Sequence, residues 1–300
     1  MLKYRLVIGA LLIAAVAAIL YVDDRFAGPL QLGPRLIRHE GLPVTFVLSV
    51  LAVIGTIEMC RLAEAAGHAP LFLWSAFSSY LIVLAPYLAH NGLVGGATSD
   101  YDLALPALLF AFFGTCVLVA ARGKTDRAIA DIAVTLLIIV YTGLLPSYIL
   151  QLRLGGGSAG VPLLVYFLAV TKSCDIGAYF TGRAIGRHKL IEWLSPKKTV
   201  EGLLGGILLS IVVAVGLSRW PVLHIWSDGD KVAPIPLGIT ISFGAAMAII
   251  GQGGDLLESL FKRDAQVKDS AHFLPAFGGV LDLIDSLLPT APVACLMLLR

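Results

Sequence analysis

Three pairs of ionisable residues stand inside otherwise apolar stretches of the C-terminal half. The members of each pair are three residues apart, and the pairs are Lys172 with Asp175, Asp255 with Glu258, and Asp282 with Asp285. Residues at this spacing share one helix face, so three faces can converge on one polar pocket. Any one of these residues could instead cap a helix or lie among lipid headgroups. Five carboxylates and one lysine leave excess negative charge, and hard carboxylate oxygens suit Mg²⁺ or Mn²⁺, so the cluster predicts a divalent cation site.

The segment from 175 to 206 supplies the opposite charge. It reads DIGAYFTGRAIGRHKLIEWLSPKKTVEGLLGG, with cations at Arg183, Arg187, Lys189, Lys197 and Lys198. Thr199 is expected to cap the following helix, with Glu201 in its first turn. Membrane insertion alone also favours basic loops. Carboxylates that hold metal and face a basic loop, however, are what a polyphosphate substrate with Mg²⁺ requires.

The sequence does not favour covalent catalysis. The six histidines are scattered over predicted loops, and none forms a nucleophile–base pair with a serine near the acidic cluster. The P-loop pattern GxxxxGK[ST] does not occur, and the four cysteines have no metal-ligand spacing. The glycines at 251, 253 and 254, and the pair at 278 and 279, instead place small residues beside the carboxylates, where helices or a phosphate can approach closely.

The elements that must position these groups are membrane helices. The 300 residues are 58% hydrophobic and only 14% charged, whereas soluble domains carry about 25% charged residues. We predict an all-α polytopic membrane protein with about nine transmembrane helices, at 6–22, 44–60, 70–90, 103–121, 128–150, 160–181, 200–220, 235–260 and 278–299. These form one membrane domain over 1–300, with N-terminal spans in 1–150 and catalytic spans and loops in 160–300. A net charge of +2 gives no basis for a nucleic-acid partner.

The distribution of Lys and Arg predicts the orientation. With the N-terminus inside, fourteen of these cations fall in inside segments and seven in outside segments. The bias predicts a cytoplasmic N-terminus. It also places the three ionisable pairs, which begin at Lys172, Asp255 and Asp282, at the cytoplasmic side of the membrane.

The C-terminal segment resembles the signature of the phosphatidate cytidylyltransferases, also called CDP-diacylglycerol synthases. The matching residues are Ser259, Lys262, Arg263, Lys268, Asp269, Leu274, Pro275, Gly278, Gly279, Asp282 and Asp285. The upstream stretches DIGAYFTGR, GRHKL and SPKKTVEG are similar to the same family, so the resemblance covers 172–286. Two positions depart from the pattern, because Phe277 and Leu283 stand where the family usually has His and Arg.

The resemblance implies that CTP and phosphatidate react to give CDP-diacylglycerol and pyrophosphate for phospholipid biosynthesis. Asp255, Asp282 and Asp285 are then the expected ligands of Mg²⁺, either as one or two divalent ions or with a monovalent cation as the second. The other expected catalytic residues are Lys268 and Asp269. The expected substrate-binding residues are Asp175 for the metal or the ribose, Lys197 and Lys198 for the CTP phosphates, and Lys262, Arg263 and Lys268 for the lipid phosphate or pyrophosphate.

The same resemblance implies an integral protein of a bacterial cytoplasmic membrane with its active site on the cytoplasmic side. Three questions stay open. The acceptor could be another lipid phosphate or a polyprenol. A cation-coupled transporter is an alternative of a different class, although no internal repeat is visible. A homodimer is an alternative to a monomer.

Overall fold

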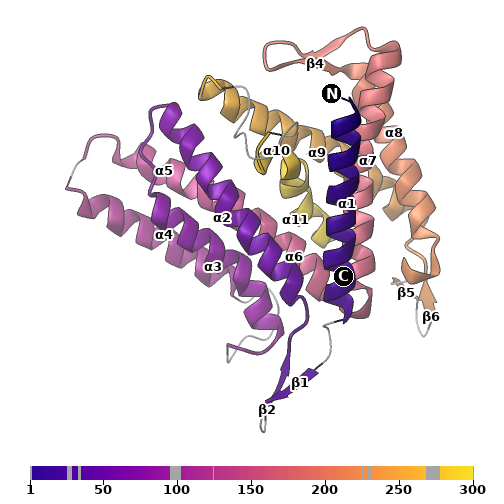
Figure 1. The fold of residues 1–300 in the computed structure, drawn as a ribbon, viewed down its shortest axis with the longest axis horizontal. Coiled ribbons are helices and arrows are strands. Elements are labelled where there is room, and N and C mark those ends of the chain that lie inside the picture. The colour runs from indigo at the N-terminus through magenta and orange to yellow at the C-terminus, as the bar shows by residue number, and fades with distance from the viewer. Residues whose placement is uncertain are drawn as a thin grey trace. The chain divides into compact units, whose positions relative to one another are not determined.

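The computed structural model describes residues 2–25, 29–32, 35–94, 103–123, 125–223, 226–228, 231–267 and 278–299. The chain divides into two compact units, which are described separately below. Unit 1 comprises Met1–Leu154 and Asp264–Leu283, and unit 2 comprises Gly155–Arg263 and Ile284–Arg300. The described part of the chain is predominantly helical, and its strands form three two-stranded antiparallel hairpins (Figure 1).

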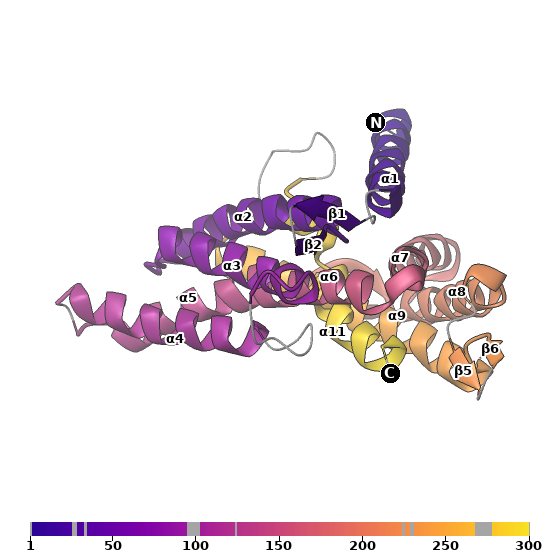
Figure 2. The same ribbon diagram turned by 90° about the horizontal axis from the view of Figure 1, so that it is seen from below.

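Unit 1 is built from long apolar helices and one hairpin. Its elements are α1 (Leu2–Arg25), β1 (Pro29–Leu32), β2 (Arg35–Arg38), α2 (Leu42–Ala65), α3 (Phe72–His90), α4 (Ala104–Ala121), α5 (Ala128–Ile139), a π-helical turn (Val140–Leu144), α6 (Leu145–Gly155) and α10 (Leu281–Ile284). Helices α2 and α3 lie side by side in both views (Figures 1 and 2). At the π-helical turn, the Thr142 hydroxyl lies 2.8 Å from that of Thr56 and 3.0 Å from that of Ser79. These hydroxyls link α2 and α3 to the helix formed by α5 and α6.

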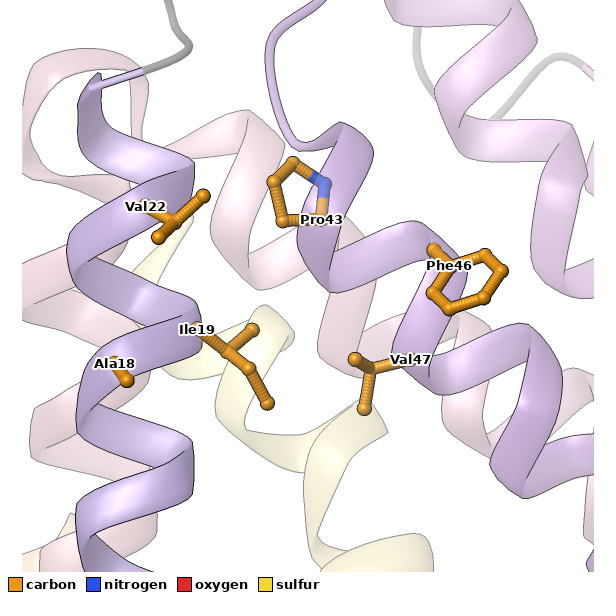
Figure 3. Close-up of a pocket in the computed structure, with 6 residues that line it drawn as sticks. All are labelled: Ala18, Ile19, Val22, Pro43, Phe46 and Val47. Carbon is orange, nitrogen blue, oxygen red and sulfur yellow. The ribbon is translucent and has the colours of Figure 1, made fainter.

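An apolar groove runs between α1 and α2 in unit 1. Its lining residues are Ala18, Ile19 and Val22 of α1 and Pro43, Phe46 and Val47 of α2 (Figure 3). Phe46 is exposed in the isolated chain, as are most described side chains of α1. Apolar side chains that are exposed along a membrane helix face lipid, so this surface fits a bilayer environment.

Unit 2 contains the remaining long helices. Its elements are η2 (Gly157–Ala159), α7 (Gly160–Ile185), β3 (Lys189–Ile191), β4 (Ser195–Thr199), α8 (Val200–Ser218), η3 (Pro221–Leu223), β5 (Trp226–Asp228), β6 (Lys231–Ala233), α9 (Leu237–Asp264) and α11 (Leu287–Leu298). Helices α7 and α8 run side by side, and the β3–β4 hairpin projects at one end of the pair (Figure 1). They cross closely at Gly177, where an added Cβ would lie 2.7 Å from the carbonyl oxygen of Gly205.

The predicted fold class is confirmed. Eight helices in the described part of the chain are long and apolar enough to cross a membrane, and they coincide with the predicted segments from 44 onward. Helix α1 forms over the predicted first segment. The N-terminal orientation stays a prediction.

The span predicted over 278–299 is confirmed over Leu281–Leu298. The prediction that Asp282 and Asp285 share one helix face is wrong, because the helix is interrupted between them. Helix α10 ends at Ile284, Asp285 and Ser286 form a turn, and α11 begins at Leu287. Pro289 has no N–H to donate to the carbonyl of Asp285, and its ring would collide with that carbonyl in a continuous helix. The Asp285 carboxylate accepts the backbone N–H of Ser286 instead, at 2.5 Å.

Candidate functional site

Three carboxylates converge in unit 2. Asp255 and Glu258 come from one face of α9, and Asp285 comes from the turn before α11. One oxygen from each lies within 4.8 Å of the others. Glu258 is only 1% exposed and Asp285 only 6%, so water screens their repulsion poorly. The group therefore needs nearby cations.

A glycine allows the approach of α9 to the Asp285 turn. A Cβ added at Gly254 would lie 2.4 Å from the carbonyl oxygen of Asp285 and 2.6 Å from Cγ of Pro289. Any larger residue would therefore push the turn away from Asp255. This confirms the expectation that a small residue beside the carboxylates permits close packing.

Two lysines supply part of the balancing charge. The Lys198 Nζ lies 2.7 Å from Oδ2 of Asp255, and the Lys262 Nζ lies 3.0 Å from Oε2 of Glu258. The Lys262–Glu258 pair is largely shielded from water, whereas the Asp255 side chain is 32% exposed. Lys198 and Lys262 therefore each offset the charge of one carboxylate of the group.

The β3–β4 hairpin carries Lys198 to the site. Successive strand residues point to opposite faces, so Lys198 reaches Asp255 while Lys197 is exposed. Thr199 ends the strand and caps α8, because its hydroxyl accepts the Gly202 N–H at 3.1 Å, as predicted. The Glu201 carboxylate, in the first turn of α8, accepts hydrogen bonds from the backbone N–H groups of Arg187 and His188. These bonds hold the segment just before β3 against the start of α8.

A second polar group lies in the same unit. The Lys172 Nζ donates to Oγ of Ser286 at 2.8 Å and to Oδ2 of Asp175 at 3.4 Å. The Gln252 side-chain amide donates to Oδ1 of Asp175 at 3.3 Å. Helices α7 and α9 and the start of α11 are thus joined by polar side chains beside the three carboxylates. The Asp175 side chain is 40% exposed and has room for a further partner.

The remaining predicted site residues have different placements. Asp282 belongs to unit 1, where its Oδ2 accepts the Gly279 N–H at 2.8 Å. Arg263 is exposed near the end of α9. Lys268 and Asp269 lie outside the described residues, as does Phe277, whereas Leu283 is part of α10.

Three contributors were not among the predicted site residues. Glu258 belongs to the predicted acidic cluster but not to the predicted metal ligands. Gln252 stands three residues before Asp255, and this helical spacing is the signal that places it on the same face. Ser286 follows Asp285 directly, but its contact with Lys172 depends on packing between distant segments.

The donor set determines what the site can bind. The carboxylate oxygens of Asp255, Glu258 and Asp285 are the hard ligands that Mg²⁺ prefers, and oxygens about 2.1 Å from such an ion lie up to roughly 4.2 Å apart. The observed upper separation of 4.8 Å is close to that spacing, so these residues fit a divalent cation. The adjacent lysines suit phosphate oxygens that share it.

Comparisons with known proteins support the same chemistry. Residues 4–299 match the model of the "Cytidylyltransferase family". The phosphatidate cytidylyltransferase of Haemophilus influenzae is 31% identical over 300 residues, which cover 97% of this chain and 96% of the relative. That of Chlamydia pneumoniae is 33% identical over 85% of this chain and 82% of its own length, and that of Bacillus subtilis is 30% identical over 84% and 93%. The match over nearly the whole chain shows that the protein belongs to the cytidylyltransferase family.

Proposed function

We propose that this protein transfers the cytidylyl group of CTP to phosphatidate, giving CDP-diacylglycerol and pyrophosphate for phospholipid biosynthesis. The observation that carries the proposal is the convergence of Asp255, Glu258 and Asp285, with Lys198 and Lys262 paired to two of them. Relatives named phosphatidate cytidylyltransferase, similar over most of the chain, supply the identity of the two substrates.

The proposed reaction needs alignment and charge neutralisation. An oxygen of the phosphatidate phosphate attacks the α-phosphorus of CTP and forms a new P–O bond. The bond from that phosphorus to the oxygen bridging to the β-phosphorus breaks, and pyrophosphate leaves with the bonding electrons. A phosphate monoester has a second pKa of about 6, so the attacking oxygen is largely ionised near neutral pH without a strong base. This agrees with a site built from carboxylates and cations.

Each described residue has a proposed role. Asp255, Glu258 and Asp285 would hold Mg²⁺, and Asp282 stays a proposed ligand alongside them. When bound, Mg²⁺ would offset the negative charge of the two substrates. Lys198 and Lys262 would bind phosphate oxygens beside the carboxylates, and Asp175 would orient the metal or the ribose.

Exposed cations complete the proposed binding surface. Lys197, beside Lys198 on β4, and Arg263, beside Lys262 on α9, are exposed and would attract CTP from solution. Lys268 and Asp269 keep their proposed catalytic roles from the family resemblance. Most of the barrier reduction would come from holding the two phosphates in line, as in other phosphoryl-transfer sites.

We place this site at the cytoplasmic face of a bacterial cytoplasmic membrane. The last turn of α7 carries Arg183, and the segment that follows it carries Arg187 and Lys189. The positive-inside rule puts such basic segments in the cytoplasm. A single cysteine at Lys197, in a variant without native cysteines, should react with an impermeant maleimide only after cells are permeabilised. Labelling of intact cells would reverse the proposed orientation.

The test of the reaction uses purified protein in phosphatidate-containing vesicles with CTP labelled at the α-phosphate. We expect labelled CDP-diacylglycerol and an equal amount of pyrophosphate, both dependent on Mg²⁺. A parallel assay replaces phosphatidate by polyprenyl phosphate or polyprenol. Product only in that parallel assay would reject phosphatidate as the acceptor. Separately, the mass of the active protein in detergent would distinguish a homodimer from a monomer.

A further inference from the structure

A buried carboxylate in the N-terminal half contacts the segment that carries the paired aspartates. Glu58 of α2 is 2% exposed. Its Oε1 accepts the Val280 N–H at 2.8 Å and its Oε2 accepts the Leu281 N–H at 2.9 Å. One side chain therefore holds two successive backbone N–H groups more than two hundred residues away.

The contact fixes a segment with little other regular structure. Gly278 has a φ of 89°, in the left-handed region that favours glycine, and α10 contains only Leu281–Ile284. Leu281 is fully buried, and a Cβ added at Gly55, one turn before Glu58, would lie 3.2 Å from its Cδ2. Glu58 and Gly55 thus hold this segment by hydrogen bonding and by packing from the same face of α2.

The same segment orients Asp282. Its Oδ2 accepts the Gly279 N–H at 2.8 Å, so three successive N–H groups, from Gly279 to Leu281, are held by carboxylates. Hydrogen bonds from N–H groups to a charged acceptor are stronger than neutral ones, and leaving such groups buried and unpaired is costly. Loss of the Glu58 carboxylate would therefore leave the backbone next to Asp282 without two of its hydrogen bonds.

We propose that Glu58 is a positioning residue that fixes residues 279–282 for cytidylyl transfer. It acts through the backbone of this segment and does not itself contact substrate. The inference gives α2 a part in orienting Asp282 within unit 1, and its kinetic consequence rests on the proposed function.

The test compares Glu58→Ala and Glu58→Gln with wild type in detergent. Hydrogen–deuterium exchange of a peptide covering 278–284 should be at least about tenfold faster in Glu58→Ala. Glu58→Gln should be intermediate, because its amide has one acceptor oxygen for two donors. The kcat, per mole of folded protein, should fall about 10- to 100-fold in the same order, with the KM for CTP changed much less.

Glu64→Ala is the matched control, because Glu64 lies on the same helix and is exposed. It should leave both exchange and kcat unchanged. Unchanged exchange in both Glu58 variants would overturn the proposal. Faster exchange with an unchanged kcat per folded molecule would also overturn it, leaving only a structural contact. A wild type inactive with CTP and phosphatidate would instead reject the proposed function, and exchange would then decide alone whether Glu58 holds the segment.

Discussion

At the residue scale, Asp285 is the most informative position. Its carboxylate is buried beside Asp255 and Glu258. Without a cation, its negative charge repels the other two carboxylates, and with a cation it would serve as a ligand. Asp285→Asn should lower kcat at least about 100-fold, by loss of charge at the reacting phosphates. It should leave the metal-free protein folded, because the substitution relieves like-charge repulsion. Turnover and thermal unfolding check the two outcomes.

The effect of Mg²⁺ on thermal stability should also distinguish Asp285→Asn from wild type, in an experiment that needs no substrate. A ligand that binds only the folded state stabilises it by about 2.7 kcal/mol at a concentration about 100 times its Kd. Wild type should show this rise in thermal stability with Mg²⁺, and Asp285→Asn should lose most of it. Asp264→Asn, at an exposed position of α9, is the control and should respond like wild type. An equal Mg²⁺ response in Asp285→Asn would remove Asp285 from the metal ligands.

At the element scale, strand β4 separates two neighbouring lysines. Lys198 is paired with Asp255 and largely buried, whereas Lys197 is exposed. Lys198→Ala should reduce kcat/KM for CTP about 10- to 100-fold, since it removes a cation placed to bind phosphate oxygens and leaves Asp255 without its partner. Lys197→Ala should change it about threefold or less, as expected for an exposed charge. Equal effects would show that the hairpin binds CTP with both faces.

The packing of α9 gives a second prediction at this scale. Gly254→Ala would place a methyl group against the Asp285 carbonyl and should destabilise the protein by about 1–3 kcal/mol, with a loss of activity. Gly253→Ala is the matched control, because no atom lies within 4 Å of its added Cβ. That neighbouring substitution should be neutral or stabilise the helix by about 0.5–1 kcal/mol. Thermal unfolding and turnover of the two variants provide the comparison.

At the scale of the whole molecule, a buried ion pair joins distant spans of unit 1. The Arg153 Nε of α6 lies 2.5 Å from Oδ2 of Asp23 in α1, and the two side chains are 2% and 0% exposed. Glu40 accepts a second hydrogen bond from Arg153 at 3.3 Å. The network joins α1 to α6 within unit 1.

Removing one partner of this pair should be costly. Arg153→Ala should destabilise the protein by about 3–5 kcal/mol, because it leaves the Asp23 carboxylate buried without its cation. The double variant Arg153→Met with Asp23→Leu should recover much of that loss, since apolar side chains replace both charges. Thermal unfolding in detergent measures both. A double variant no more stable than Arg153→Ala would show that the pair is irreplaceable.

The sequence determined the membrane helices and the chemical class of the site. Apolar runs long enough to cross a bilayer are a local property, so the predicted segments and observed helices coincide from 44 onward. The pair of Asp255 and Glu258 could be predicted for the same reason, since a three-residue spacing within one helix fixes a shared face. The whole-chain similarity to cytidylyltransferases agrees with the motif between 172 and 286.

Only the tertiary structure decided which groups meet. It interrupted the last predicted helix at Asp285, brought that turn beside Asp255 and Glu258, and paired Lys198 with Asp255. It also revealed Glu58, whose partners lie more than two hundred residues away and leave no periodic signal. Helix formation depends on neighbours in sequence. Side-chain convergence depends on packing between distant segments, which spacing along a chain does not specify.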